Sequence, residues 1–239
     1  MKKLKILSII SVILVVLLTT STIVLSVLLV NKKDKTRELS YFDRKIMMFE
    51  FENLNFAKEQ IVFIGDSITD LCVLDDYYSD LPLATYNRGI GADTTEKVLN
   101  RLKVSLFDLQ PAKVVLLIGV NDIIFDLGVN NLLLNYGIIL NDINLNLPNT
   151  EVLCLSILPM NQAVNSTAVP NVEKSNQIIM DVNIEIEKIV DEYDYEFVNL
   201  FPEFADDNNY LKEEFSDDGL HLNHNGYVVL SNKLKPMLM

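Results

Sequence analysis

Five short apolar runs, separated by longer amphipathic segments, place the strongest limit on the fold of this 239-residue chain. The runs are Ile61 to Ile64, Leu83 to Tyr86, Val114 to Ile118, Val152 to Ile157 and Glu196 to Leu200. Short runs rich in β-branched and aromatic residues predict buried strands. Their alternation with helical segments is typical of βαβ units, which build parallel sheets. We therefore expect an α/β fold with a five-stranded parallel sheet.

The segments between the predicted strands have helical periodicity. Asp93 and Glu96 stand at the spacing of a capping box, which predicts that a helix begins there. Apolar residues then recur every three or four positions, as in helices that bury one face. They are Val98, Leu102 and Leu106; Ile178, Val182, Ile186, Ile189 and Tyr193; and Tyr227, Leu230 and Leu234. We expect such helices to cover both faces of the sheet.

A stretch without charged residues runs from Ile6 to Val30, ahead of the predicted sheet. As a helix it would be about 37 Å long, more than the ~30 Å of a bilayer's hydrocarbon core. A cleaved signal peptide has a shorter apolar core and a small-residue cleavage site, and TTSTIVLSVLLV offers no convincing site. We therefore predict an N-terminal membrane anchor, residues 1–30, with a single transmembrane helix at about 6–30. Basic residues flank both ends, so they do not decide its orientation.

Residues 31–58 are predicted to connect this anchor to the main domain, residues 59–239. Asn31 to Ser40 is polar, and the following segment places Phe42, Ile46 and Phe49 at helical spacing. We expect that helix to pack its apolar side on the main domain.

The charge of the main domain excludes one class of partner. The first 40 residues hold 7 of the 20 basic and 2 of the 33 acidic residues, so the remainder has a net charge of −18. A domain this acidic, without a basic cluster, repels phosphate backbones. We expect no nucleic acid partner.

Three polar corners follow the first three predicted strands. They are Gly65-Asp66-Ser67, the block NRGIGADTT from Asn87 to Thr95, and Gly119-Val120-Asn121-Asp122. Taken singly, Asp66 or Ser67 could cap a helix, and Asn121 could be a turn residue. Parallel sheets, however, bind ligands beyond the carboxyl ends of their strands. All three corners are expected to meet at that edge.

Ser67 would need a base to act as a nucleophile, and the chain contains only two histidines, His221 and His224. Asp218 precedes His221 by three residues, which lets the two side chains meet. Such a pair alone could equally be a cap, a surface ion pair or part of a metal site. No third histidine or spaced cysteine set completes a metal site, and Cys72 and Cys154 read as buried thiols. No metal or cofactor is therefore predicted.

Together these motifs resemble the SGNH (GDSL-type) hydrolase family, from about residue 59 to the C-terminus. The closest similarity is to its platelet-activating-factor acetylhydrolase-like branch, in the runs IGDSITD and NRGIGADTTEKVLNRL. The resemblance implies a flavodoxin-like three-layer sandwich. The G-x-S-x-G motif of ordinary α/β-hydrolases is absent from the sequence.

The resemblance also implies roles for single residues. Ser67 would be the nucleophile, His221 the base, and Asp218 the group that orients the imidazole. The oxyanion hole would consist of the Ser67 N–H, an N–H of the second block, and the amide of Asn121. The family usually has glycine where this chain has Ala92, so Ala92 is the expected donor and Gly91 the alternative. Alanine would resist a left-handed conformation there by roughly 1 kcal/mol.

The predicted function is a serine esterase that removes small acyl groups, including O-acetyl groups, from a glycan or lipid. The family's habits and the predicted anchor place the catalytic domain outside the cytoplasm. One alternative is a membrane-anchored carbohydrate- or lipid-binding module with the same fold and little catalysis. Another is a nucleotide binder that uses Gly89 and Gly91, although the chain lacks a P-loop lysine and a strict G-x-G-x-x-G.

Overall fold

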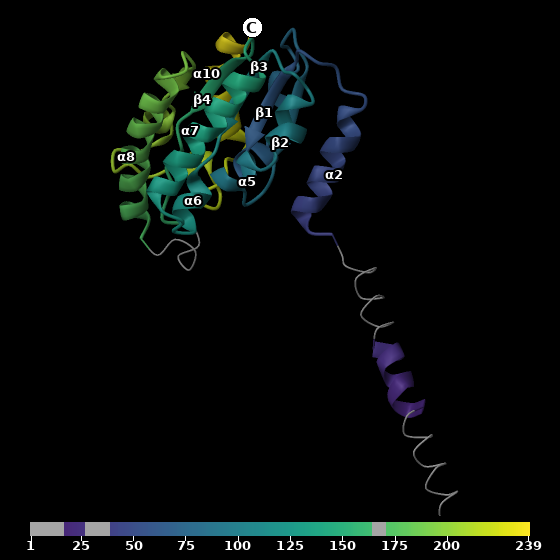
Figure 1. Ribbon diagram of the computed structural model, residues 1–239. Helices are drawn as coiled ribbons and strands as arrows, with labels where there is room; N and C mark the ends of the chain where they lie inside the picture. Colours follow the sequence, from purple (N-terminus) through teal and green to yellow (C-terminus); the bar gives the residue numbers. More distant parts are fainter. Residues whose placement is uncertain (1–16, 27–38, 164–170) are drawn as a thin grey trace, which may run out of the picture. The chain divides into compact units, whose positions relative to one another are not determined.

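A computed structural model describes residues 17–26, 39–163 and 171–239 of the protein (Figure 1). Its strands are β1 (Ile61–Gly65), β2 (Thr85–Gly89), β3 (Lys113–Leu117), β4 (Glu151–Leu155) and β5 (Glu196–Val198). They form one parallel sheet in the order β2-β1-β3-β4-β5. The predicted α/β fold and five-stranded parallel sheet are confirmed. The largest shift concerns β2, which begins two residues later than predicted and extends to Gly89.

Helices connect the strands and flank the sheet. They are α2 (Tyr41–Asn53), α3 (Ser67–Asp70), α4 (Leu74–Tyr78), α5 (Thr95–Leu99), α6 (Val120–Ile124), α7 (Val129–Asn146), α8 (Val172–Asp191), α9 (Phe201–Phe204) and α10 (His224–Leu238). The chain also has a π-helical turn η1 (Lys103–Phe107) and a 3-10 turn η2 (Glu213–Phe215).

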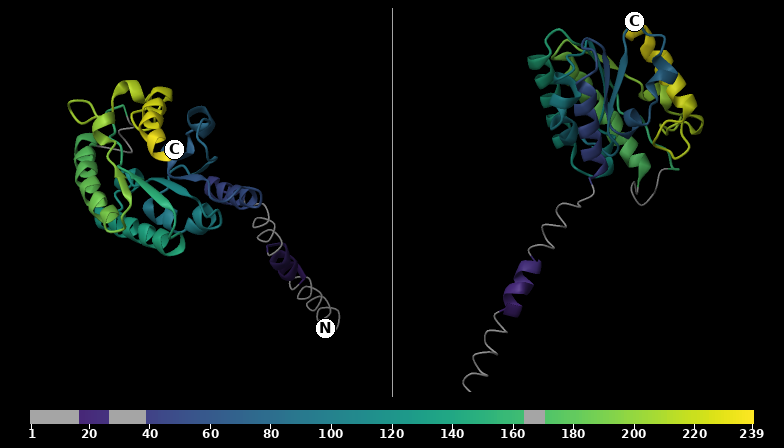
Figure 2. Two further views of the ribbon diagram at one scale, coloured as in Figure 1. Left: turned by 90° about the horizontal axis from the view of Figure 1, so that it is seen from above. Right: turned by 90° about the vertical axis from the view of Figure 1, so that its right-hand side faces the viewer.

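The central strands β1, β3 and β4 bury residues on both faces, whereas the edge strands β2 and β5 are partly exposed. In β1, Val62 and Ile64 belong to the core on one side of the sheet, under α5, α7 and α8. Ile61 and Phe63 belong to the core on the other side, under α4 and α10. Figure 2 shows the yellow α10 and the teal-to-green α7 and α8 on opposite faces. Burial on both faces explains why the sequences of these central strands are continuous apolar runs.

The first predicted helix has the expected buried face and a different N-terminus. Val98, Leu102 and Leu106 are buried, as predicted. The capping box is wrong, because the N-cap of α5 is Thr94, whose hydroxyl accepts a hydrogen bond from the Lys97 N–H. Asp93 instead lies fully buried and pairs with Arg101.

The two long C-terminal helices follow the predicted periodicity with one offset. Helix α8 buries Val182 and Ile186 as predicted, but Ile179 and Val190 take the buried positions expected for Ile178 and Ile189. Helix α10 buries all three predicted residues, Tyr227, Leu230 and Leu234.

Helix α2 packs on the sheet beside β2. Phe49 is fully buried, and the guanidinium of Arg88 lies 4.5 Å from the centre of its ring. Arg88 also donates hydrogen bonds to the side chains of Glu52 (2.6 Å) and Asn53 (2.9 Å). The expected packing through Phe49 is confirmed, and a buried arginine of β2 reinforces it.

The chain divides into two compact units, with the boundary between Arg44 and Lys45. Of the predicted transmembrane segment 6–30, the structure describes residues 17–26, which are helical, and the remainder lies outside the described residues. The described part of the chain has no helix with the length and hydropathy of a membrane span. The anchor therefore stays a prediction.

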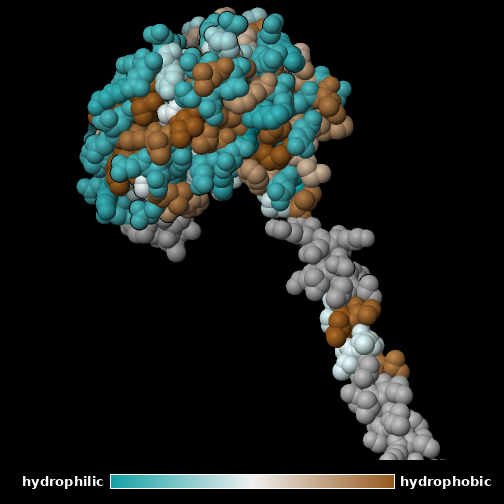
Figure 3. Space-filling view, viewed as in Figure 1, coloured by the Kyte–Doolittle hydropathy of each residue, from teal (hydrophilic) through white to brown (hydrophobic). Residues whose placement is uncertain are grey.

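The face of the second unit seen in Figure 3 mixes hydrophilic and hydrophobic side chains. The exposed apolar residues of α7 include Leu134 and Leu145, which are 62% and 69% exposed. Scattered apolar residues are usual on protein surfaces and identify no site by themselves.

Candidate active site

Ser67 lies where β1 ends and α3 begins. It is the first residue of α3, and Asp66 is the N-cap, whose carboxylate accepts a hydrogen bond from the Ile68 N–H at 2.9 Å. The cap is therefore Asp66, which leaves the Ser67 hydroxyl for another partner. The end of α3 lies close against β2, since a Cβ on Gly89 would be 2.2 Å from the Asp70 nitrogen. Glycine at position 89 thus lets α3 sit against the sheet edge.

The structure brings Ser67, His221 and Asp218 together. The Ser67 Oγ lies 2.9 Å from His221 Nε2, and His221 Nδ1 lies 2.6 Å from Asp218 Oδ2. The other carboxylate oxygen of Asp218 accepts hydrogen bonds from the N–H groups of Leu220 (2.9 Å) and His221 (2.8 Å). The backbone of this loop therefore holds the carboxylate against the imidazole.

The charge of Asp218 sets the tautomer of His221. Partial burial raises the pKa of Asp218, but hydrogen bonds from the His221 ring and two backbone N–H groups outweigh it and keep that pKa below its usual value. An ionised carboxylate only accepts hydrogen bonds, so Nδ1 must carry the proton. Nε2 is then an acceptor and receives the Ser67 hydroxyl proton.

A tight turn from Ile90 to Asp93 carries the second predicted block. The Asp93 N–H donates to the Ile90 carbonyl at 3.2 Å, and Ala92 has a φ of +59° while Gly91 does not have a positive φ. This is the pattern of a type II turn, which prefers glycine at the position that Ala92 occupies. The Gly91 N–H donates to Asp70 Oδ2 at 2.9 Å. Within the described residues, the N–H groups of Ser67 and Ala92 have no hydrogen-bond partner.

Asn121 lies beside this turn. It is in the first turn of α6, which follows Gly119 with a φ of +126°. Its side-chain nitrogen donates to the Asp93 carbonyl at 2.9 Å, and only 5% of the residue is exposed. An amide nitrogen has two hydrogens, so this bond orients the group and leaves one donor.

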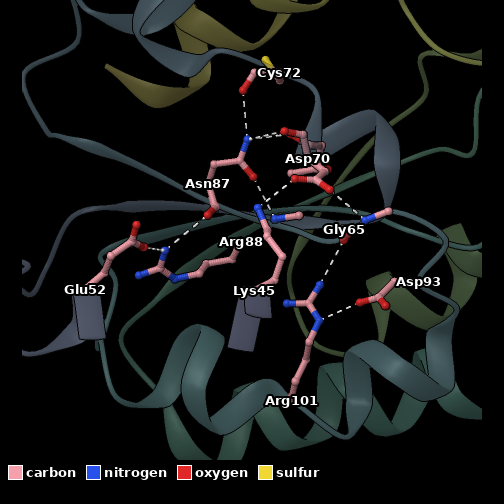
Figure 4. Close-up of polar contacts among 12 residues, drawn as sticks. Lys45, Glu52, Gly65, Asp70, Cys72, Asn87, Arg88, Asp93 and Arg101 are labelled. Atoms are coloured by element: carbon pink, nitrogen blue, oxygen red, sulfur yellow. Dashed lines mark hydrogen bonds and ion pairs between the residues drawn. The ribbon is translucent and has the colours of Figure 1, made fainter. Parts of the chain in front are cut away.

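Arg101 connects segments around the site through its guanidinium group (Figure 4). Its Nε lies 2.7 Å from Asp93 Oδ2, and its Nη2 donates to the Gly65 carbonyl at 3.0 Å. Its Nη1 donates to Ser105 at 2.7 Å. Burial raises the pKa of Asp93, and Arg101 offsets part of that effect. Arg101 therefore joins the end of β1 to the turn that contains Ala92.

Asp66 is the most strongly perturbed carboxyl group near Ser67. Burial raises its pKa to about 7, although the hydrogen bond from Ile68 opposes that effect; the charges of Asp93 and Asp122 raise it further. Its second oxygen, Oδ2, is buried and has no partner within the described part of the chain. At neutral pH this group is thus close to its own titration midpoint.

Three residues that support the site were missed by sequence reasoning. Asp70 binds the Gly91 N–H, and Arg101 binds Asp93 and Gly65. Asn87 donates to the carbonyls of Thr69 (2.7 Å) and Cys72 (2.9 Å) at the end of α3. The available signal was weak: Arg101 is a charged residue inside a predicted buried helix face, next to Leu102.

The second histidine and the two cysteines take no part in the contacts among Ser67, His221 and Asp218. His224 is exposed and lies 3.0 Å from the Tyr77 hydroxyl. Burial raises the pKa of Cys72 and of Cys154 to about 12, so both thiols stay protonated. Among the residues described, no cluster of three His, Cys, Asp or Glu side chains could hold a metal ion. A hollow of about 490 Å³ beside α8 is lined by Asn176, Tyr210 and their neighbours, and by none of the residues around Ser67.

A serine hydroxyl bound to an imidazole–carboxylate pair at the carboxyl edge of a parallel sheet is typical of serine hydrolases. The profile of the GDSL-like lipase/acylhydrolase family matches residues 63–229, and the chain belongs to this family. It is a carboxylic ester hydrolase. The resemblance inferred from the motifs is confirmed.

The chain is also similar to individual relatives and solved structures. The platelet-activating factor acetylhydrolase IB subunit alpha2 of Rattus norvegicus is 26% identical over 182 residues, which cover 75% of this chain and 76% of that protein. A Streptococcus pneumoniae structure, proposed to be a platelet activating factor, is 31% identical. The match covers 92% of this chain and 99% of that one, with a TM-score of 0.75. An acetylxylan esterase from Geobacillus stearothermophilus shares the fold at 16% identity, covering 77% and 95% of the two chains, with a TM-score of 0.59.

Proposed function

We propose that the protein hydrolyses esters of small acyl groups through Ser67, His221 and Asp218. The observation that carries this proposal is the continuous contact from Ser67 Oγ to His221 Nε2 at 2.9 Å and from His221 Nδ1 to Asp218 at 2.6 Å. A nucleophile, a base and an orienting carboxylate in this order are the parts that acyl transfer to serine requires.

The reaction has two halves. In the first half, Ser67 Oγ attacks the ester carbonyl carbon while His221 Nε2 takes the hydroxyl proton and then gives it to the leaving alcohol. In the second, a water molecule gives a proton to His221 and attacks the acyl-serine. The proton then returns to Ser67 Oγ as the carboxylic acid leaves. Asp218 stabilises the imidazolium that forms in both halves.

The negative charge on the carbonyl oxygen needs hydrogen-bond donors that are already in place. We propose the N–H groups of Ser67 and Ala92 and the free amide hydrogen of Asn121 for this role. Two features support Ala92 over Gly91 as the second donor. The Gly91 N–H is already used by Asp70, whereas the Ala92 N–H has no partner in the described chain. The positive φ of Ala92 also belongs to a strained turn, a conformation that functional sites tend to retain.

We propose acetyl esters on a glycan or lipid as the substrate class. The names of the relatives support this choice, since an acetylhydrolase subunit and an acetylxylan esterase both act on acetyl groups. The site itself is open, because Ser67 and His221 are half-buried and the Asp218 side chain is 54% exposed. An open site suits an acyl ester carried by a larger molecule.

The test is hydrolysis of p-nitrophenyl esters by the full-length protein, with Ser67→Ala as its control. We expect the acetate to react faster than the butyrate and octanoate, and the Ser67→Ala variant to lose nearly all turnover. Equal slow rates in both proteins would contradict the proposal and favour a binding module with a silent site. A preference for octanoate would keep the mechanism and reject the acetyl substrate class.

We also propose that the chain is anchored in a membrane, with its catalytic domain outside the cytoplasm. The support is the charge-free sequence from Ile6 to Val30, which is long enough for a bilayer as a helix. We expect the protein in the membrane fraction, and we expect protease added to intact cells to remove the domain. Recovery in the soluble fraction at high salt and without detergent would reject the anchor.

A further inference from the structure

Asp70 connects three parts of the protein that are distant in sequence. It is the last residue of α3, the short helix that begins with Ser67. Its Oδ1 lies 2.8 Å from the Lys45 Nζ of α2, and its Oδ2 accepts a hydrogen bond from the Gly91 N–H at 2.9 Å. Figure 4 shows the Asp70 carboxylate between Lys45 and the end of the sheet.

The bond to Gly91 fixes the turn that carries the proposed oxyanion donor. Gly91 and Ala92 are the two central residues of the turn from Ile90 to Asp93. Holding the Gly91 N–H fixes the peptide plane that precedes this residue, and the turn then sets the direction of the next N–H, that of Ala92. The carbonyl of Ala92 accepts a further hydrogen bond from Lys97 at 2.9 Å. The turn is thereby fastened on both sides of its donor.

We propose that Asp70 is a positioning residue for the oxyanion hole and that Lys45 is the partner that holds its carboxylate. This inference rests on the proposed function of the site. It extends the catalytic unit beyond the family region, which begins at residue 63, to helix α2.

The burial of the pair supports this role. The side chains of Lys45 and Asp70 are 14% and 9% exposed. A carboxylate this shielded from water needs a compensating cation and satisfied hydrogen bonds. With Lys45 on one oxygen and Gly91 on the other, the carboxylate has one orientation, and that orientation points Oδ2 at the turn.

The remaining contacts of α2 keep Lys45 in place. Glu52 and Asn53 hold Arg88, and Phe49 is fully buried under the same guanidinium. These contacts dock the helix without touching the turn. They therefore provide controls that separate docking of α2 from the specific contact between Lys45 and Asp70.

The first experiment measures kcat and KM of the full-length protein for p-nitrophenyl acetate. We expect Asp70→Ala to lower kcat by roughly 10- to 100-fold, because a displaced oxyanion donor loses much of its effect. Lys45→Met and Asp70→Asn should each lower kcat about 3- to 10-fold. In Asp70→Asn the amide oxygen can still accept the hydrogen bond from the Gly91 N–H, and in Lys45→Met the carboxylate keeps that bond but loses its cation. KM should change by less than about threefold, because the donors act mainly in the transition state.

Two control variants test whether the effect is specific. Lys113→Met removes another lysine that is 14% exposed. It lies at the amino end of the central strand β3, where it forms an ion pair with Glu151 at 2.9 Å and donates a hydrogen bond to the Met237 carbonyl. Glu52→Gln weakens the docking of α2 without touching Asp70. Both should keep kcat within about twofold of wild type. A loss in Glu52→Gln equal to that in Lys45→Met would overturn the proposal, because docking alone would then explain the effect.

The second experiment measures hydrogen exchange of the Gly91 amide in the same proteins. We expect exchange to become at least about tenfold faster in Asp70→Ala, and to stay unchanged in Lys113→Met. Unchanged exchange, or wild-type kcat in Asp70→Ala, would overturn the proposal. If the wild type shows no turnover that depends on Ser67, the proposed function fails, and the exchange result alone decides whether Asp70 holds the turn. If Asp70→Ala does not fold, Asp70→Asn and Lys45→Met decide in both experiments.

Discussion

The two sides of the site around Ser67 are built in different ways. On the base side, Asp218 and His221 come from one loop, three residues apart, and their side chains are 54% and 31% exposed. On the oxyanion side, Asp66, Asp93, Arg101 and Asn121 come from four segments, and each is at most 5% exposed. The base side therefore depends on local spacing, whereas the oxyanion side depends on the packing of the core. We expect changes on the base side to affect catalysis alone, and changes on the oxyanion side to affect stability as well.

The largest expected effect comes from Asp218→Asn. The amide would stabilise the wrong tautomer of His221, so kcat should fall by roughly 10³- to 10⁴-fold. The free energy of unfolding should change by less than about 1 kcal/mol, because the Asp218 side chain is largely exposed and exposed polar pairs contribute little. Steady-state kinetics and urea denaturation measure the two quantities. A stability loss of several kcal/mol would break the distinction between the two sides.

Arg101→Met, on the oxyanion side, should lower the free energy of unfolding as well as kcat. It leaves Asp93 as an uncompensated buried carboxylate, and breaking such a pair costs roughly 3–5 kcal/mol. Urea denaturation is the measurement, with Lys188→Met as the control. Lys188 forms an exposed pair with Glu185, so its loss should cost about 0.5 kcal/mol or less. Similar small losses in both variants would show that the oxyanion side is no more dependent on packing than the surface.

Asp66→Asn should reveal the buried carboxyl through its pH dependence. Burial raises the pKa of Asp66 from 3.8 to about 7, so the folded state binds this proton more tightly than the unfolded state. Its contribution to stability is complete below about pH 4 and is lost as the pH rises through 7. Asparagine has no such dependence.

The free energy of unfolding of the wild type, relative to Asp66→Asn, should therefore decrease between pH 4 and pH 8. This difference in free energy should fall by about 1.4 kcal/mol per pH unit, and by at most about 4 kcal/mol in total. Urea denaturation across this range measures it. Parallel pH profiles for the two proteins would mean that Asp66 is not held in a dry environment.

The smallest expected effect is that of Ala92→Gly. Glycine adopts a φ of +59° without steric cost, whereas alanine pays roughly 1 kcal/mol there. The greater flexibility of glycine in the unfolded chain offsets part of this gain. We expect thermal denaturation to show a stabilisation of about 0.5 kcal/mol, with the N–H donor retained and kcat within about threefold. A destabilised variant would mean that the Ala92 side chain makes a favourable contact in the turn.

The predictions from sequence succeeded where the signal was local. The alternation of apolar runs predicted the parallel sheet, and the spacing of Asp218 and His221 predicted their contact. The predictions were wrong where a polar residue is buried. Asp93 looked like part of a helix cap but pairs with Arg101, so Thr94 became the cap.

Asp70 shows the same limit of sequence analysis. An acid at the end of a short turn gives no sign that it faces a lysine on α2 and the N–H of Gly91. Both partners are more than 20 positions away along the chain. Such a contact arises only when the two segments meet in the folded protein.

The sequence by itself determined which residues could do the chemistry, since one serine motif, one suitably placed histidine and one nearby acid were present. It also indicated the sheet, because short apolar runs that alternate with helical segments are typical of parallel strands covered by helices on both faces. The tertiary structure decided which N–H groups remained free, which turn Ala92 adopted, and which buried charges met. Those choices depend on shielding from water and on contacts between distant segments, neither of which is encoded in local spacing.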